Sequence, residues 1–275
     1  MRTVQRVAVD GTELHVERRG AGPPLLLVQG MGANSLHWGE PFLAALEEDF
    51  ELLLFDHGGI GRSASRAGEL TIAGLAGDAL ALLDALDVPA AHVFGISMGG
   101  MVAQEIALGA PERVLTLMLG CTSCGGTQSS PTPPEVVGQL TAAVLSGDHE
   151  RVLRTGFGFV VSRAYAGDPE HYAAFAAAAR DYPATLTALM EQKAAVERFD
   201  AYSRLRGLRV PARVMHGSQD VLLAPINGDL VASLIPGARF ELLEGAGHLF
   251  FWEQPRRTAR LVREFALGAG VRSPG

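Results

Sequence analysis

The stretch Gly95-Ile96-Ser97-Met98-Gly99 constrains this chain more than any other part of its sequence. It follows an apolar run, residues 91–94, and precedes a helical pattern. This order predicts a strand, a sharp turn and a helix, with Ser97 at the apex of the turn in a strained backbone conformation. Gly95 and Gly99 let the helix approach the strand because neither carries a Cβ atom. The Ser97 hydroxyl is therefore expected above the edge of a sheet, near the free N–H groups of a helix N-terminus.

A nucleophilic serine needs a histidine as its base and a carboxylate that orients the histidine, and both follow later in the chain. In this kind of turn the chain order is Ser, Asp or Glu, then His. A strand pattern from residue 210 leads into a loop that presents Asp220, and one from residue 240 leads into a glycine loop that presents His248. The sequence therefore predicts Ser97 as nucleophile, His248 as general base and Asp220 as the orienting acid.

Other residues compete weakly for these roles. The end of the preceding strand, residues 119–124, carries no carboxylate, so Asp220 has no rival there. Among the eight histidines, His37 is the competitor for the base, because it lies near the loop expected to bind the oxyanion. His216 precedes a glycine at the end of a strand and is interpreted as structural.

On these motifs the chain resembles the α/β-hydrolase superfamily over nearly its whole length. The matching segments are 25–32, 56–63, 95–100, 216–220 and 245–248. Within the superfamily, residues 95–104 look most like the corresponding turn of 3-oxoadipate enol-lactonases and related lactonases and esterases. Position implies that the backbone N–H groups of Met31 and Met98 form the oxyanion hole. Most relatives carry histidine where this chain has Gln29.

Alternating strands and helices predict a mostly parallel sheet covered by helices on both faces. The resemblance implies an α/β-hydrolase fold with eight strands and a helical cap inserted after strand 6. Residues 126–207 read as a loop followed only by helices, about four of them, so they are predicted to form the cap domain. The core domain is then expected to comprise residues 1–125 and 208–275.

An apolar substrate pocket is expected between the cap and the core. The residues that adjoin the predicted site in sequence or lie on the cap, and that we expect to line the pocket, are Gly30, Trp38, Phe157, Phe159, Leu222 and Leu249.

Composition excludes several classes of function. A net charge of −7 and the lack of a Lys/Arg-rich run argue against a nucleic-acid partner. No apolar run reaches the ~18 residues that a membrane span needs, and the first residues are not a signal peptide, so a cytoplasmic location is expected. Cys121 and Cys124 are interpreted as reduced thiols near the pocket floor, and no metal site or cofactor is expected. The oligomeric state, monomer or homodimer, stays open.

The sequence thus predicts a cofactor-independent serine hydrolase that cleaves a carboxylic ester or a lactone through an acyl-enzyme. Carbon–carbon bond hydrolases, cofactor-free perhydrolases and lyases share such a triad and remain alternatives. A ligand receptor on the same fold is a third possibility, but such proteins often lose a triad residue. Epoxide hydrolases and haloalkane dehalogenases use aspartate at the turn, so Ser97 argues against both.

Overall fold

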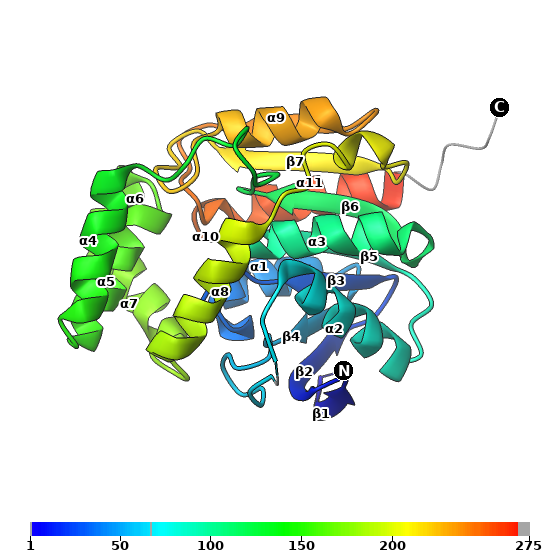
Figure 1. Cartoon of the computed structure of the whole chain (residues 1–275), viewed down its shortest axis with the longest axis horizontal. Coiled ribbons are helices and arrows are strands. Elements are labelled where there is room, and N and C mark those ends of the chain that lie inside the picture. Colours follow the sequence, from blue (N-terminus) through cyan, green and yellow to red (C-terminus); the bar gives the residue numbers. More distant parts are fainter. Residues whose placement is uncertain (1, 67, 269–275) are drawn as a thin grey trace.

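A single mixed sheet forms the centre of the molecule (Figure 1). The computed structural model describes residues 2–66 and 68–268, and within them eight strands lie in the order β1-β2-β4-β3-β5-β6-β7-β8. β1 and β2 form an antiparallel hairpin, β2 is also antiparallel to β4, and all further pairs are parallel. The strands are β1 Thr3–Val9, β2 Thr12–Gly20, β3 Pro24–Val28, β4 Glu51–Phe55, β5 Ala91–Ile96, β6 Val114–Gly120, β7 Ala212–Gly217 and β8 Arg239–Leu243. The fold predicted from the sequence is confirmed.

Helices cover both faces of the sheet, and each face has its own apolar core. One core packs β-strand side chains against α2 (Ile72–Ala85), α3 (Met98–Gly109) and α9 (Ile226–Leu234). The other packs them against α1 (Glu40–Leu46), α10 (Phe250–Glu253) and α11 (Pro255–Gly268). Because strand side chains alternate in direction, Leu26 contributes to the first core and its neighbours Leu25 and Leu27 to the second. The continuous apolar runs of the sequence are therefore strands buried on both sides.

The helical segment that follows β3 is broken in two. Residues Ser35–Trp38 form a 3₁₀ helix, and α1 begins at Glu40. Gly39 between them has a φ of 73°, which favours glycine and ends the first helix. A Cβ atom there would also come within 3.1 Å of the indole ring of Trp252.

Residues 126–207, which we call the cap segment, contain five α-helices where about four helices were expected, and a short 3₁₀ helix, Leu205–Gly207. The α-helices are α4 Pro134–Leu145, α5 His149–Val160, α6 Arg163–Ala166, α7 Pro169–Ala179 and α8 Leu186–Arg198. The additional one, α6, is a single turn that starts where the side chain of Ser162 accepts a hydrogen bond from the N–H of Tyr165 (3.2 Å). The cap segment has a small core of its own, which includes Phe157 and Phe175 and packs against Leu249 and Trp252.

No helix in residues 2–66 and 68–268 combines the length and the apolar character needed to cross a membrane.

Helix α3 approaches the sheet so closely that two positions tolerate only glycine. A Cβ atom at Gly99 would lie closer than 3.0 Å to the carbonyl oxygens of Val28 and Gln29, and one at Gly95 would lie equally close to the carbonyl oxygen of Gly99. Real Cβ atoms essentially never come so close to backbone atoms. The close approach predicted for the glycines around Ser97 is therefore confirmed.

We expect Gly99→Ala to lower the free energy of unfolding by about 3 kcal/mol or more, because the methyl group forces helix and strand apart. Gly77→Ala is the matched control: Gly77 is an exposed glycine in α2, and a Cβ atom there has no neighbour within 4 Å. This control should be neutral or stabilising by up to about 1 kcal/mol. Urea denaturation measures both, and equal midpoints for the two variants would contradict the close approach.

Candidate active site

Ser97 lies in the turn between β5 and α3, at the carboxyl edge of the sheet. Its backbone has φ 56° and ψ −123°, a conformation that residues other than glycine rarely adopt. Its N–H donates to the carbonyl oxygen of Gly120 (2.9 Å), and its own carbonyl oxygen accepts from the hydroxyl of Thr122 (2.7 Å). The end of β6 and the residues directly after it therefore hold the strained turn through both backbone groups of Ser97.

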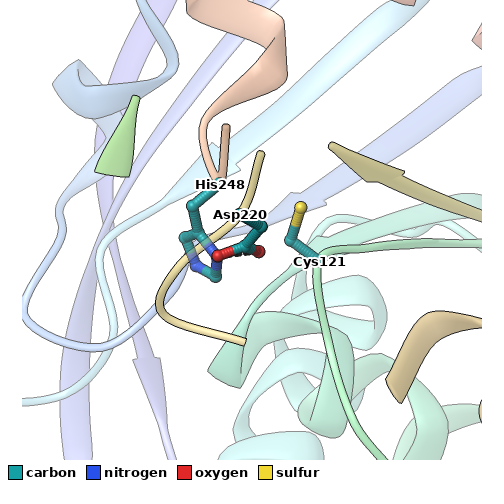
Figure 2. A group of neighbouring side chains, drawn as sticks. All are labelled: Cys121, Asp220 and His248. Carbon is teal, nitrogen blue, oxygen red and sulfur yellow. Dashed lines mark hydrogen bonds and ion pairs between the residues drawn. The ribbon is translucent and has the colours of Figure 1, made fainter. Parts of the chain in front are cut away.

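Asp220 and His248 form a buried hydrogen-bonded pair at the same edge (Figure 2). Asp220 follows β7, His248 follows β8, and Nδ1 of His248 lies 2.7 Å from Oδ2 of Asp220. Since a carboxylate only accepts, Nδ1 carries the proton of this hydrogen bond, and in this tautomer Nε2 is the acceptor nitrogen. The N–H groups of Leu222 and Leu223 donate to Oδ1 of Asp220 (2.9 and 3.0 Å), which fixes the carboxylate plane.

His216 is a second imidazole on the same carboxylate. It is completely buried, and its Nε2 lies 3.1 Å from Oδ2 of Asp220 and 2.8 Å from the carbonyl oxygen of Leu223. Burial alone raises the pKa of Asp220, but the interactions with His248 and His216 outweigh burial and hold that pKa below its ordinary value. Asp220 therefore stays ionised, as the acid of a triad must.

Cys121 lies against the Asp220–His248 pair (Figure 2). Its Sγ, a carboxylate oxygen of Asp220 and a ring nitrogen of His248 all lie within 4.8 Å of one another, close enough to hold a metal ion. Burial raises the pKa of the Cys121 thiol well above its usual value, and a protonated thiol is a poor ligand. Nδ1 of His248 is already hydrogen-bonded to Asp220. The donor set thus suits a hydrogen-bonded pair better than a metal centre.

Ser97 lies at the same edge of the sheet as this pair, and no hydrogen bond joins them. β6 lies between β5 and β7 in the sheet, and its end contacts both parts of the site. The carbonyl oxygen of Gly120 accepts a hydrogen bond from Ser97, and the next residue, Cys121, contacts the Asp220–His248 pair. Within residues 2–66 and 68–268, the Ser97 hydroxyl forms no hydrogen bond. Hydrogen bonds to a nucleophile are often long before substrate binds, so this geometry is compatible with a triad.

Both predicted oxyanion donors are available. Met98 is the first residue of α3, so its N–H has no partner within the helix. The N–H of Met31 donates to no residue in the described part of the chain, whereas its neighbours Gly30 and Gly32 donate to the side chains of Gln29 (3.0 Å) and Gln192 (2.7 Å). The loop lies close to Ser97, because a Cβ atom at Gly30 would be 3.2 Å from the Cβ of Ser97.

A pocket of about 360 Å³ opens beside Asp220, between the cap segment and the loop after β7. The residues that line it are Ser130, Pro131, Pro133, Glu135, Val136, Gln139, Phe159, Asp220, Val221 and Ala224. Of the predicted pocket residues, Phe159 is among them. Leu222 is half-buried and Gly30 lies against Ser97, whereas the N–H of Leu249 donates to the carbonyl oxygen of Val160 on the cap (2.7 Å).

The prediction that Trp38 lines the pocket is wrong. Trp38 is completely buried in the apolar core on the face of α1, α10 and α11, where its ring packs against Phe42, Phe94 and Phe251 (centroid distances 6.0, 5.5 and 4.9 Å). Phe157 also packs inside the small core of the cap segment rather than in the pocket beside Asp220.

Three contacts in this site were not predicted from the sequence. The Thr122 hydroxyl donates to Ser97 and the N–H of Gly32 donates to Gln192, in each case between segments that are distant in sequence, and no motif marks Thr122 or Gln192. The proximity of His216 to Asp220 could have been anticipated, because residues four apart across a strand-to-loop turn can meet.

His37, the competing base, has a different role. Its Nδ1 accepts a hydrogen bond from the N–H of Asn34 (3.2 Å), which closes the start of the 3₁₀ helix. Burial is the main cause that lowers the pKa of His37 to about 4. The ring is therefore neutral at neutral pH, with its Nδ1 lone pair already engaged in the helix cap.

We expect His37 to destabilise the folded protein in acid. Its pKa is about 4 in the folded protein and 6.5 when the side chain is free in water, so the unfolded chain binds the proton more readily as the pH falls from 6.5 to 4. The free energy of unfolding therefore falls as the pH drops from 6.5 to 4, and His37→Gln should reduce this fall by up to roughly 3 kcal/mol. Urea denaturation at pH 7 and at pH 4 measures the free energy of unfolding of each variant. His149→Gln, an exposed control, should behave like wild type; an equal pH dependence in H37Q would contradict the assignment.

The chain is similar to known hydrolases both in sequence and in structure. A family model described as alpha/beta hydrolase fold matches residues 23–255. A putative carbamate hydrolase, RutD, of Azorhizobium caulinodans is 32% identical over 245 residues, which cover 86% of this chain and 89% of that protein. Among solved structures, the enol-lactonase from Burkholderia xenovorans LB400 superposes with a TM-score of 0.83 at 28% identity, covering 96% of this chain and 100% of that one. The esterase RhEst1 from Rhodococcus sp. ECU1013 gives 0.81 at 26% identity, with 97% and 99% covered.

Proposed function

The chain belongs to the α/β-hydrolase fold family, and we propose that it is a serine hydrolase that cleaves a carboxylic ester or a lactone through an acyl-enzyme. The observation that carries the proposal is the buried 2.7 Å hydrogen bond between Asp220 and His248, at the sheet edge where Ser97 has a φ of 56°. A histidine oriented by an ionised carboxylate, next to a serine in a strained turn, is the arrangement that acyl transfer requires.

The reaction follows from these positions. Oγ of Ser97 attacks the carbonyl carbon while Nε2 of His248 takes the hydroxyl proton, and Asp220 stabilises the imidazolium that forms. The negative oxygen of the tetrahedral intermediate accepts hydrogen bonds from the N–H groups of Met31 and Met98. The intermediate collapses, the C–O bond to the alcohol breaks, and the alcohol leaves with the proton from His248. Water then repeats the sequence on the acyl-enzyme and releases the acid and Ser97.

The ester or lactone class is supported by both the pocket and the relatives. The similar proteins are named for esters, an enol-lactone and a carbamate, and in each the carbonyl carbon bears a heteroatom leaving group. The pocket beside Asp220 is lined mainly by apolar groups such as Val136 and Phe159, and no Lys or Arg from the described residues lines it, whereas Glu135 does. An uncharged, apolar acyl or alkyl group therefore fits this pocket better than a carboxylate.

We expect Ser97→Ala to lower kcat for p-nitrophenyl acetate by at least about 10³-fold without unfolding the protein, because the nucleophile is lost. His248→Ala should be similarly severe, and the double variant no worse than either single one, since residues of a triad act as a unit. Steady-state kinetics measures kcat, and circular dichroism checks that each variant is folded. Ser203→Ala, an exposed serine, is the control. If S97A turned over substrate at the rate of S203A, Ser97 would not be the nucleophile.

We expect Val136→Phe to shift substrate preference toward short acyl chains, because Val136 is buried and lines the pocket. The ratio of kcat/KM for p-nitrophenyl octanoate to that for the acetate should fall at least about tenfold, the scale of one to two lost apolar contacts. Val137→Phe is the matched control, since Val137 is 40% exposed and does not line this pocket. An identical chain-length profile in both variants would show that the acyl group binds elsewhere.

A further inference from the structure

A glutamine of the cap segment reaches the loop that holds the proposed oxyanion donor. Gln192 lies on α8 and is only 1% exposed. Its Oε1 accepts a hydrogen bond from the N–H of Gly32 at 2.7 Å, across 160 residues of sequence. A backbone N–H can only donate, so the atom that faces it must be the amide oxygen. Nε2 is buried and has no partner among the residues the structure describes. The side chain is therefore held here through its oxygen.

A second glutamine does the same on the other side of Met31. Oε1 of Gln29 accepts from the N–H of Gly30 at 3.0 Å. The amides of Gly30 and Gly32 are thus both occupied, and the amide of Met31 between them is the one that stays open within the described chain. Two glutamines therefore select which N–H of the loop can bind a negative oxygen.

Further contacts tie this loop to the cap segment. Gly32 has a φ of 71°, and a Cβ atom there would lie 2.6 Å from Cδ2 of Leu189, one turn before Gln192 on α8. The side-chain amide of Asn34 donates to the carbonyl oxygens of Asp181 and Tyr182 (3.2 and 3.3 Å), just before α8 begins. Packing and hydrogen bonds from the cap segment thus fix the loop along residues 32–34.

We propose that Gln192 is a positioning residue of the oxyanion hole: it couples the cap segment to the Met31 amide by holding the N–H of Gly32. This rests on the proposed function, in which Met31 stabilises the tetrahedral intermediate. The oxyanion forms only in the transition state, so a loosened loop weakens transition-state binding more than substrate binding. Removing the Gln192 side chain is therefore expected to lower kcat and to leave KM nearly unchanged.

The test compares Gln192→Met, which removes the acceptor at similar size, with Gln192→Glu, which keeps an acceptor oxygen. Met190→Gln is the control on the same helix, because Met190 is 63% exposed. With p-nitrophenyl acetate, Q192M should lose roughly tenfold to a hundredfold in kcat, a part of the loss seen when an oxyanion donor is removed. KM should change little, and the inhibition constant of phenylboronic acid, whose Ser97 adduct is tetrahedral, should rise by the factor lost in kcat. Q192E should recover most of both losses.

A second readout does not depend on activity. Amide hydrogen exchange of the peptide that covers residues 29–33 should be faster in Q192M than in wild type and unchanged in M190Q. Wild-type exchange in Q192M, or wild-type kcat and boronate inhibition, overturns the proposal; so does an equal loss in Q192E and Q192M.

The Ser97→Ala variant separates the two hypotheses. If S97A is inactive while Q192M is fully active, the role of Gln192 alone is overturned. If S97A is active, the proposed function fails, and the role of Gln192 in it fails as well.

Discussion

The contact between the backbone of α3 and the end of β3 is the constraint on which the site depends. Only a glycine at position 99 allows the helix to lie against the carbonyl oxygens of Val28 and Gln29. That contact sets the angle of the turn and with it the unusual backbone of Ser97. It also brings the loop after β3 to the start of α3, where the proposed function has the N–H groups of Met31 and Met98 bind one oxygen atom. One close approach thus fixes the proposed nucleophile and the proposed oxyanion donors together.

The cap segment is hydrogen-bonded both to the loop that carries Met31 and to the residues around His248. Through Gln192 it reaches the loop after β3, and through the carbonyl oxygen of Val160 it reaches Leu249, directly after His248. Glu253 adds a bridge, since its Oε1 accepts from the N–H groups of Gly247 and Ser162 at 2.7 and 3.0 Å. Motion of the cap segment would therefore displace the loop of Met31 and the segment around His248 together; under the proposed function, this would couple the oxyanion donor and the base to the position of the cap segment.

The sequence was most informative where physical constraints are local. Apolar runs such as residues 25–28 specify strands, and the glycines around Ser97 specify the turn, because both depend on neighbouring residues. The two remaining members of the site, Asp220 and His248, were found from their places after strands. Trp38 was misplaced because its burial depends on packing against Phe94 and Phe251, which are distant in sequence. The contact of Gln192 with Gly32 depends on how the cap segment packs, and no local pattern encodes tertiary packing.

Positive φ angles recur at the ends of two adjacent strands: 56° at Ser97 after β5 and 39° at Cys121 after β6. Each such residue costs of order 1–3 kcal/mol, which the surrounding packing offsets. The edge that carries the proposed active site thus holds two strained backbone positions at the ends of adjacent strands. A relaxed backbone at Ser97 or Cys121 would make the fold more stable. It would also move either the turn that holds Ser97 or the residue that contacts the Asp220–His248 pair, so stability and geometry conflict at this edge. Adaptation to higher temperature should therefore accumulate at the opposite edge and on the outer helices, leaving the strained edge as it is.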